Sequence, residues 1–269
     1  MGLFTSALFG CPGLEFESDR ERFPAGSSVY PVAVSAVTPS EKLKLLANVE
    51  LFSGFSAKQL EAASRVARSK TLERRQELFH KGDEGGEVFV VASGKLKALT
   101  TSMDGDDVVF SILGPGEVFG EVALLGATPR TATVTAIEDC RLLVIDRRDF
   151  MSFLRADPDI AVKLLSVLAM RLKRVSELVE DTLFLNLPLR LAKKLLALSR
   201  IYGQKAADGI RIDLKLSQEE WGDLVGTTRE SVNKQVRKWT DAGIVRVDDG
   251  YLVILKPVEL EKLAGAVIY

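Results

Sequence analysis

A regular heptad pattern in the middle of the chain constrains the fold most strongly. Between residues 160 and 182, apolar side chains recur at alternating intervals of four and three, which predicts one long helix with a coiled-coil seam. The seam positions are Ala161, Leu165, Leu168, Leu172, Val175 and Val179. The seam fits packing on the helix's own domain or a parallel homodimer, and its regularity favours the homodimer. The sequence "FLNLP" then predicts a hinge, because Pro188 suits the first turn of a new helix.

Short strand patterns precede this helix. From Leu72 to Ile145, runs rich in Val, Ile and Phe, such as "EVFVVAS" and "DVVFSIL", alternate with turn sequences such as "KGDEGG" and "GPGE". This spacing predicts a β-sandwich, jelly roll or barrel. Apolar positions between residues 41 and 70 predict short helices ahead of it.

Two helix-start signals follow the hinge. Ser217 with Glu220, and Thr227 with Glu230, fit the capping-box pattern, and Gly226 lies in the short turn between the two predicted helices. Two short helices joined by such a turn predict a helix-turn-helix, and "GIVRVDDGYLVIL" predicts a hairpin wing.

The second of these helices has two distinct sides. Its buried side is predicted from Val232, Val236 and Trp239. Its opposite side carries the polar residues Arg229, Glu230, Asn233, Lys234 and Arg237. An alternative role for Glu230 is that of a helix cap alone.

Composition excludes several classes of protein. The 36 basic and 37 acidic residues leave a net charge of −1, so any basic surface for nucleic acid must be local. His80 is the one histidine and Cys11 and Cys140 are the two cysteines, which excludes a multi-histidine metal centre and disfavours an iron–sulfur cluster and a cupin-like enzyme. The same shortage of ligands leads us to expect no metal and no catalytic cofactor. No apolar run reaches membrane-spanning length, so we also expect no membrane partner.

The first 40 residues stand apart from these patterns. "MGLFTSALFGC" loosely fits a myristoylation site and a signal sequence, but it lacks the basic segment that a signal peptide needs. We therefore expect a flexible extension on a protein that stays in the cytoplasm.

The segment "FGEVALLGATPRTATV" places one acid, Glu121, and one base, Arg130, among apolar or small residues. Burying either charge is costly unless it has a partner. A ligand with hydroxyls and a phosphate would satisfy both, since a carboxylate accepts hydrogen bonds and a guanidinium matches phosphate oxygens. An internal Glu121–Arg130 ion pair would satisfy them equally well on chemistry alone.

This segment resembles the phosphate-binding cassette of cyclic-nucleotide-binding domains, F-G-E-x-A-L followed by P-R-[TSA]-A. Together with the long helix and the helix-turn-helix, it makes residues 41–265 similar to the cyclic AMP receptor protein (CRP/FNR) family of bacterial transcription regulators. The resemblance implies that Glu121 binds the ribose 2′-hydroxyl and Arg130 the cyclic phosphate. It also places Gly120, Val122 and Thr131 at the ligand, Thr131 through a hydroxyl to the phosphate or the base.

The identity of the base depends on two further positions. The family meets adenine with successive Thr and Ser residues on the long helix, where this chain has Val175 and Ser176. Val175 offers no hydrogen bond and strengthens the seam, so we expect selectivity for adenine to be relaxed and the dimer to depend less on ligand. Thr131 also matches cyclic-GMP-binding domains. Cyclic AMP is the expected effector, and cyclic GMP is its competitor.

The resemblance extends to DNA recognition. "TTRESVNKQVRKW" is similar to the family's recognition helix, with Arg229 and Glu230 matching its Arg-Glu pair and Lys234 replacing a second Arg. Arg reads guanine and Glu accepts from cytosine N4, so a TGTGA-like half-site is expected, with its inner guanine the weakest position. Residues better placed for phosphates are Ser217, Thr228, Arg237 and Lys238.

The sequence therefore predicts an α+β chain of four parts. They are an extension (1–40), a cyclic-nucleotide-binding β jelly roll (41–155), a dimerisation helix (156–185) and a winged helix-turn-helix (186–269). The implied function is that of a homodimeric regulator that binds double-stranded DNA, a cyclic nucleotide and RNA polymerase. The alternative is a ligand-independent regulator of the same family with a purely structural cassette.

Overall fold

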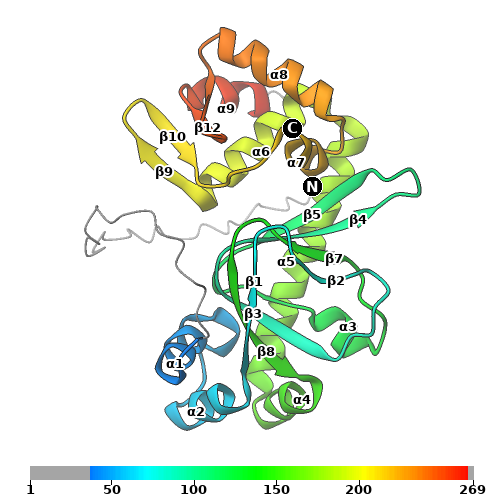
Figure 1. Ribbon diagram of the computed structural model, residues 1–269, viewed down its shortest axis with the longest axis vertical. Coiled ribbons are helices and arrows are strands. Elements are labelled where there is room, and N and C mark those ends of the chain that lie inside the picture. The colour runs from blue at the N-terminus through cyan, green and yellow to red at the C-terminus, as the bar shows by residue number, and fades with distance from the viewer. Residues whose placement is uncertain (1–36, 266–269) are drawn as a thin grey trace, which may run out of the picture. The chain divides into compact units, whose positions relative to one another are not determined.

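The computed structural model describes residues 37–265, so most of the predicted N-terminal extension lies outside the described residues. The described chain begins with a helical segment that packs on a barrel (Figure 1). Its elements are α1 (Pro39–Asn48), the 3₁₀ turn η1 (Glu50–Phe52) and α2 (Ala57–Val66). Thr38 and Glu41 form a capping box at the start of α1, so this helix begins slightly before the predicted boundary at residue 41.

A barrel of two four-stranded antiparallel sheets follows, which confirms the predicted jelly roll. One sheet has the order β1-β8-β3-β6 and the other β2-β7-β4-β5. The elements of this region are β1 (Arg68–Leu72), β2 (Glu77–Phe79), β3 (Glu87–Ser93), β4 (Leu96–Thr101), β5 (Asp107–Leu113), β6 (Val118–Phe119), α3 (Glu121–Gly126), β7 (Thr133–Ala136) and β8 (Cys140–Asp146).

The strand β3 shows why the strand sequences of the barrel are nearly continuous apolar runs. Val88 and Val90 face the cluster formed with α1, α2 and the long helix, whereas Phe89 and Val91 face the opposite sheet. Both sides of the strand are buried, so no polar alternation is left in its sequence.

The long helix is α5 (Pro158–Phe184), preceded by α4 (Arg147–Ala156). It begins at the N-cap Asp157, whose side chain accepts from the backbone N–H of Asp159. Ile160 and Leu164 are its buried residues, while the predicted seam is largely exposed, Leu165 by 64% and Leu172 by 68%. The described protomer therefore does not cover the coiled-coil seam.

A third four-stranded sheet and four helices form the C-terminal region, shown from yellow-green to red in Figure 1. Its elements are α6 (Leu187–Tyr202), β9 (Gly203–Ala206), β10 (Gly209–Ile212), α7 (Gln218–Val225), α8 (Arg229–Asp241), β11 (Val245–Asp248), β12 (Tyr251–Ile254) and α9 (Pro257–Gly265). The sheet order is β11-β12-β10-β9, so the predicted wing pairs with a hairpin, β9–β10, that the sequence patterns did not indicate.

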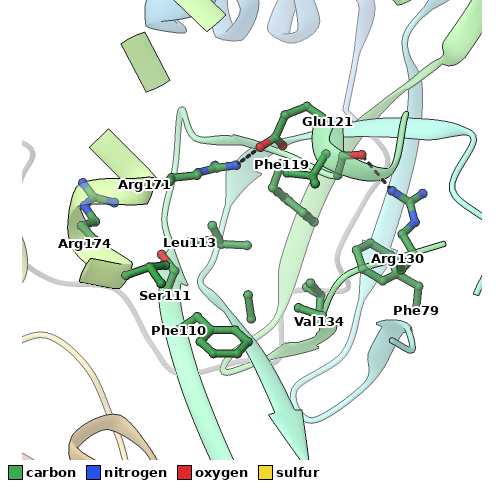
Figure 2. Close-up of a pocket in the computed structure, with 15 residues that line it drawn as sticks. Phe79, Phe110, Ser111, Leu113, Phe119, Glu121, Arg130, Val134, Arg171 and Arg174 are labelled. Carbon is green, nitrogen blue, oxygen red and sulfur yellow. Dashed lines mark hydrogen bonds and ion pairs between the residues drawn. The ribbon is translucent and has the colours of Figure 1, made fainter. Parts of the chain in front are cut away.

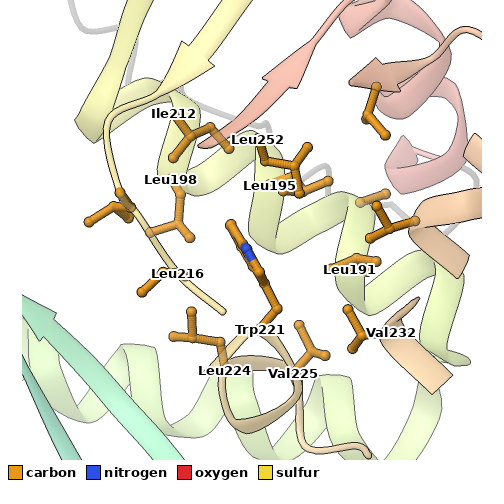
Figure 3. Close-up of a cluster of buried hydrophobic side chains, with 14 of the residues drawn as sticks. Leu191, Leu195, Leu198, Ile212, Leu216, Trp221, Leu224, Val225, Val232 and Leu252 are labelled. Atoms are coloured by element: carbon orange, nitrogen blue, oxygen red, sulfur yellow. The ribbon is translucent and has the colours of Figure 1, made fainter. Parts of the chain in front are cut away.

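The core of this region surrounds Trp221, which is the largest fully buried side chain of α7 (Figure 3). Leu191 and Leu195 of α6 and Val232 of α8 lie in the same cluster. The helix-turn-helix is thus held by contacts of α6, α7 and α8 with one apolar centre.

The two predicted helix starts have different outcomes. The Ser217–Glu220 capping box is present, and Gly226 ends α7 in the left-handed conformation with φ 65°. The prediction of a Thr227–Glu230 capping box is wrong. Thr228 is the N-cap of α8, and its side chain accepts from the backbone N–H of Ser231. The capping residue of α8 therefore lies one position later than predicted.

Candidate functional site

The cassette segment lines a cavity of about 170 Å³ between the barrel and α5. Its floor is mostly apolar, and Glu121, Arg130 and Arg171 bring charge to it (Figure 2). The lining residues are Phe79, Ala98, Phe110, Ser111, Leu113, Phe119, Gly120, Glu121, Val122, Arg130, Ala132, Val134, Arg171, Arg174 and Val175. The structure thus brings Gly120, Glu121, Val122, Arg130 and Val175 of the predicted site together.

Glu121 is almost completely buried, with 1% exposure, at the first position of α3. Its partner is Arg171 of α5, whose Nη1 donates to Oε1 at 2.5 Å, and Arg171 also donates to the backbone carbonyl of Val118. The internal Glu121–Arg130 ion pair is therefore not the arrangement that the structure shows. The acid of the cassette joins the barrel to the long helix instead.

Arg130 is buried to 5% exposure and is held by backbone and aromatic groups. Its Nη1 donates to the carbonyls of Glu87 at 3.0 Å and Gly120 at 3.2 Å. Its guanidinium lies over the ring of Phe79, 4.3 Å from the centroid, an arrangement that favours a cation. Burial lowers the pKa of Arg130 from its usual value, against the opposing effect of nearby carboxylates.

Gly120 shapes the turn that places both charges. Its φ is +86°, and a Cβ built there would lie 2.7 Å from Nη1 of Arg130 and 3.0 Å from the carbonyl oxygen of Glu87. A larger residue would strain the backbone and displace the arginine. This position therefore requires glycine.

Two charged atoms at this site have no protein partner. Oε2 of Glu121 and Nε of Arg130 are buried and make no hydrogen bond within the described part of the chain. An unsatisfied buried donor or acceptor costs roughly 1–3 kcal/mol, and more when it is charged. The site is therefore chemically prepared for a molecule that offers a hydroxyl donor and an anionic acceptor.

The end of the cavity near α5 is formed by Phe110, Ser111, Arg174 and Val175. Ser111, Arg171 and Arg174 were not predicted as site residues. The spacing of Arg171, Arg174 and Val175, three and four residues apart on one helix, could have indicated a shared face. Thr131 and Ser176 are exposed and do not line this cavity within one protomer, so their ligand roles stay predictions.

The second predicted site lies on α8. The six residues Arg229, Glu230, Asn233, Lys234, Arg237 and Lys238 are all exposed. Val232, Val236 and Trp239 are buried on the other side, as predicted. Ser217 and Thr228 are exposed and cap α7 and α8, so their hydroxyls lie at the starts of two helices, where backbone N–H groups favour anions.

Comparisons with known proteins identify two domain families in the chain. Residues 69–157 match the cyclic nucleotide-binding domain family, and residues 189–263 match the Crp-like helix-turn-helix domain family. The chain thus combines a cyclic-nucleotide-binding barrel with a DNA-binding domain.

Relatives match most of the chain. A CRP-like cAMP-activated global transcriptional regulator of Mycobacterium tuberculosis is 31% identical over 82% of this chain and 99% of its own length. The cyclic AMP receptor protein of Thermus thermophilus is 30% identical over 80% of this chain and 96% of its own length. The solved structure of a variant of CooA from Carboxydothermus hydrogenoformans has 25% identity and a TM-score of 0.64 over 74% of this chain and 88% of that one.

The chain belongs to the cyclic AMP receptor protein (CRP/FNR) family. It is a DNA-binding transcription regulator with a cyclic-nucleotide-binding domain and is not an enzyme. Among the described residues, no helix is both long and apolar enough to cross a membrane.

Proposed function

We propose that the chain is a cytoplasmic, homodimeric regulator whose DNA binding is controlled by a 3′,5′-cyclic nucleotide bound in the cavity of Glu121 and Arg130. The observation that carries the proposal is the pair of buried charged atoms without partners, Oε2 of Glu121 and Nε of Arg130, beside one cavity. The ribose 2′-hydroxyl would donate to Glu121, and the cyclic phosphate would accept from Arg130.

The expected effector is cyclic AMP, with cyclic GMP as the competitor. The names of the Mycobacterium and Thermus relatives refer to cyclic AMP, which supports the first choice. Val175 lines the cavity and cannot form a hydrogen bond to a base, so discrimination would rest on Ser111, Thr131 and the partner subunit.

The dimer is supported by the exposed seam of α5. Leu165, Leu172, Val175 and Val179 leave apolar surface on one helix that a second copy would cover. Two-fold symmetry would place two recognition helices about 34 Å apart, which requires a palindromic operator. We expect TGTGA-like half-sites, with Lys234 at the inner guanine, and RNA polymerase as the further partner.

A ligand-independent regulator is the second candidate, and one observation favours it. Arg171 already pairs with Oε1 of Glu121, and Arg130 already donates to two carbonyls, so both charges are partly satisfied without a nucleotide. The cavity would then be structural, and the regulator would bind DNA constitutively.

Titration of DNA binding with cyclic AMP and cyclic GMP separates the two candidates. The intact protein should bind an inverted repeat of TGTGA half-sites more tightly with nucleotide, and calorimetry should detect binding of the same nucleotide. Arg130→Ala should abolish both responses, whereas Arg148→Ala, at a highly exposed arginine of α4, should leave them unchanged. Tight DNA binding with no nucleotide bound by calorimetry would support the ligand-independent candidate instead.

A further inference from the structure

The strands β4 and β5 have two differently occupied faces. On one face, Ala98 and Ser111 line the nucleotide cavity. On the other, Leu99, Val109 and Ile112 belong to the buried cluster that contains the core of the DNA-binding domain. The β4–β5 pair is therefore in contact with both functional sites of the chain.

A charged contact accompanies this apolar one. Nζ of Lys97, on β4, lies 3.7 Å from Oε1 of Glu220 and 3.9 Å from Oδ2 of Asp223, both on α7. The side chains of Lys97 and Asp223 are only 14% and 13% exposed, so water screens this contact less than a surface ion pair. Lys97 thus ties the barrel to the first helix of the helix-turn-helix.

The loop between these strands faces the predicted DNA contacts. Asp106 of this loop and Asp107 at the start of β5 line a cleft of about 620 Å³ together with Ser217, Thr228 and Arg229. DNA phosphates approaching these three residues would meet carboxylates at short range. In this arrangement the barrel presents negative charge where the DNA backbone has to lie.

We propose that the β4–β5 loop and the Lys97 contact hold the DNA-binding domain in an autoinhibited arrangement. Asp106 and Asp107 exclude the phosphate backbone, while Lys97 keeps α7 against the barrel. DNA binding then requires this contact to open, and a ligand can promote opening only by binding the open arrangement more tightly.

Asp223 makes the contact sensitive to pH. Burial raises the pKa of Asp223 to about 6, Lys97 lowers it, and Asp107, Glu219 and Glu220 raise it further. Lys97 and Asp107 of the barrel lie beside Asp223, so in this proposal opening the contact exposes the carboxyl to water and returns its pKa toward the ordinary value. The docked form then binds the proton more tightly, and docking strengthens as the pH falls below about 6. The other charged residues that line the cleft with Asp223 are Arg75, Asp106 and Arg229.

The loop itself offers a matched pair of variants. Asp106→Asn and Asp104→Asn remove one negative charge each, but Asp104 is exposed and does not line the cleft. The full-length protein without nucleotide should bind a duplex at low salt about fivefold more tightly with Asp106→Asn, and less than about twofold more tightly with Asp104→Asn. Equal effects of the two variants would show that only net charge matters and would overturn the masking role.

The lysine contact is tested with two substitutions at one position. Lys97→Gln should raise the affinity of the nucleotide-free protein for DNA, even though it removes a positive charge. Lys97→Arg should keep the wild-type affinity. Lower or unchanged affinity of a Lys97→Gln protein that keeps the wild-type thermal midpoint would overturn the proposal. A loss of DNA binding by Lys97→Gln caused by misfolding would be visible as a lowered thermal midpoint, and Asp106→Asn then still decides.

The pH dependence gives a third readout. Nucleotide-free DNA affinity of the wild type should fall between about pH 7 and pH 5, and Asp223→Asn should be flat over that window at the low value. These measurements use no nucleotide and a duplex of any sequence. They can therefore succeed if the proposed nucleotide control fails, and a missing nucleotide response does not bear on them.

Discussion

The nucleotide cavity and the recognition helix use charged residues in opposite environments. Glu121 and Arg130 are buried, and each is held by contacts from elsewhere in the chain. Arg229 and Lys234 are exposed on one side of α8, where water solvates them until DNA replaces it. Charged residues therefore contribute to folding as well as to ligand binding in the barrel, whereas those on α8 make no contact within the described chain that the fold depends on.

This difference predicts how substitutions divide between stability and function. Removing a charge from the cavity leaves its buried partner without compensation, so folding and ligand binding suffer together. Removing a charge from the exposed polar side of α8, here called the recognition side, lets water take the place of the side chain and affects DNA binding alone. Substitutions in the two regions should therefore differ in whether stability falls together with function.

The largest effect is expected for Glu121→Ala. Arg171 would lose its carboxylate partner, and one end of the contact between barrel and α5 would be left uncompensated. We expect the free energy of unfolding to fall by about 3 kcal/mol, at the lower end for a broken buried pair because Arg171 retains some exposure. Urea denaturation measures it, with Glu230→Ala as the control that stays within about 0.5 kcal/mol. A similar loss in both variants would erase the distinction between the regions.

The next effect concerns Arg229→Ala. Because Arg229 is exposed at the start of α8, stability should change little, whereas discrimination at one base pair should fall by about 1–3 kcal/mol. Competition binding with half-sites changed at single positions measures the discrimination. If the variant weakened binding to all sequences equally, Arg229 would be a phosphate contact and not a base contact.

The sequence predicted the elements whose patterns are local. The strand "EVFVVAS" coincides with β3, and the heptad helix predicted for residues 160–182 lies within α5. The exposed and buried sides of α8 also follow directly from helical periodicity. These features depend on residues close together in the chain.

What the sequence did not predict depends on partners far apart. Glu121 and Arg171 are fifty residues apart, so nothing local indicated that this arginine, and not Arg130, would pair with the acid. The β9–β10 hairpin has weak apolar alternation and is defined by its pairing with β12. The N-cap of α8 was misplaced because "TTRES" offers two adjacent threonines with the same chemistry, and the structure uses Thr228.

The choice between the two threonines gives a prediction with an effect of intermediate size on stability. Thr228→Ala should destabilise the DNA-binding domain by about 1 kcal/mol, since its hydroxyl accepts from the N–H of Ser231. Thr227→Ala should have a smaller effect, because the structure assigns the cap to its neighbour. Thermal unfolding of the two variants measures the difference, and a larger loss with Thr227→Ala would restore the cap that the sequence pattern suggested.

The smallest effect on stability and specificity is expected for Lys238→Ala, which sharpens the comparison within the recognition side itself. Lys238 is exposed near the end of α8, about two and a half turns beyond Arg229, where a side chain reaches phosphate more readily than base edges. Its loss should weaken binding to specific and unrelated duplexes by the same factor and make the salt dependence shallower by about one unit of slope per contact. Titrations at several salt concentrations measure this slope. A loss confined to one operator position would move Lys238 among the base-reading residues, and the recognition side would then extend further along α8 than the Arg229–Lys234 segment indicates.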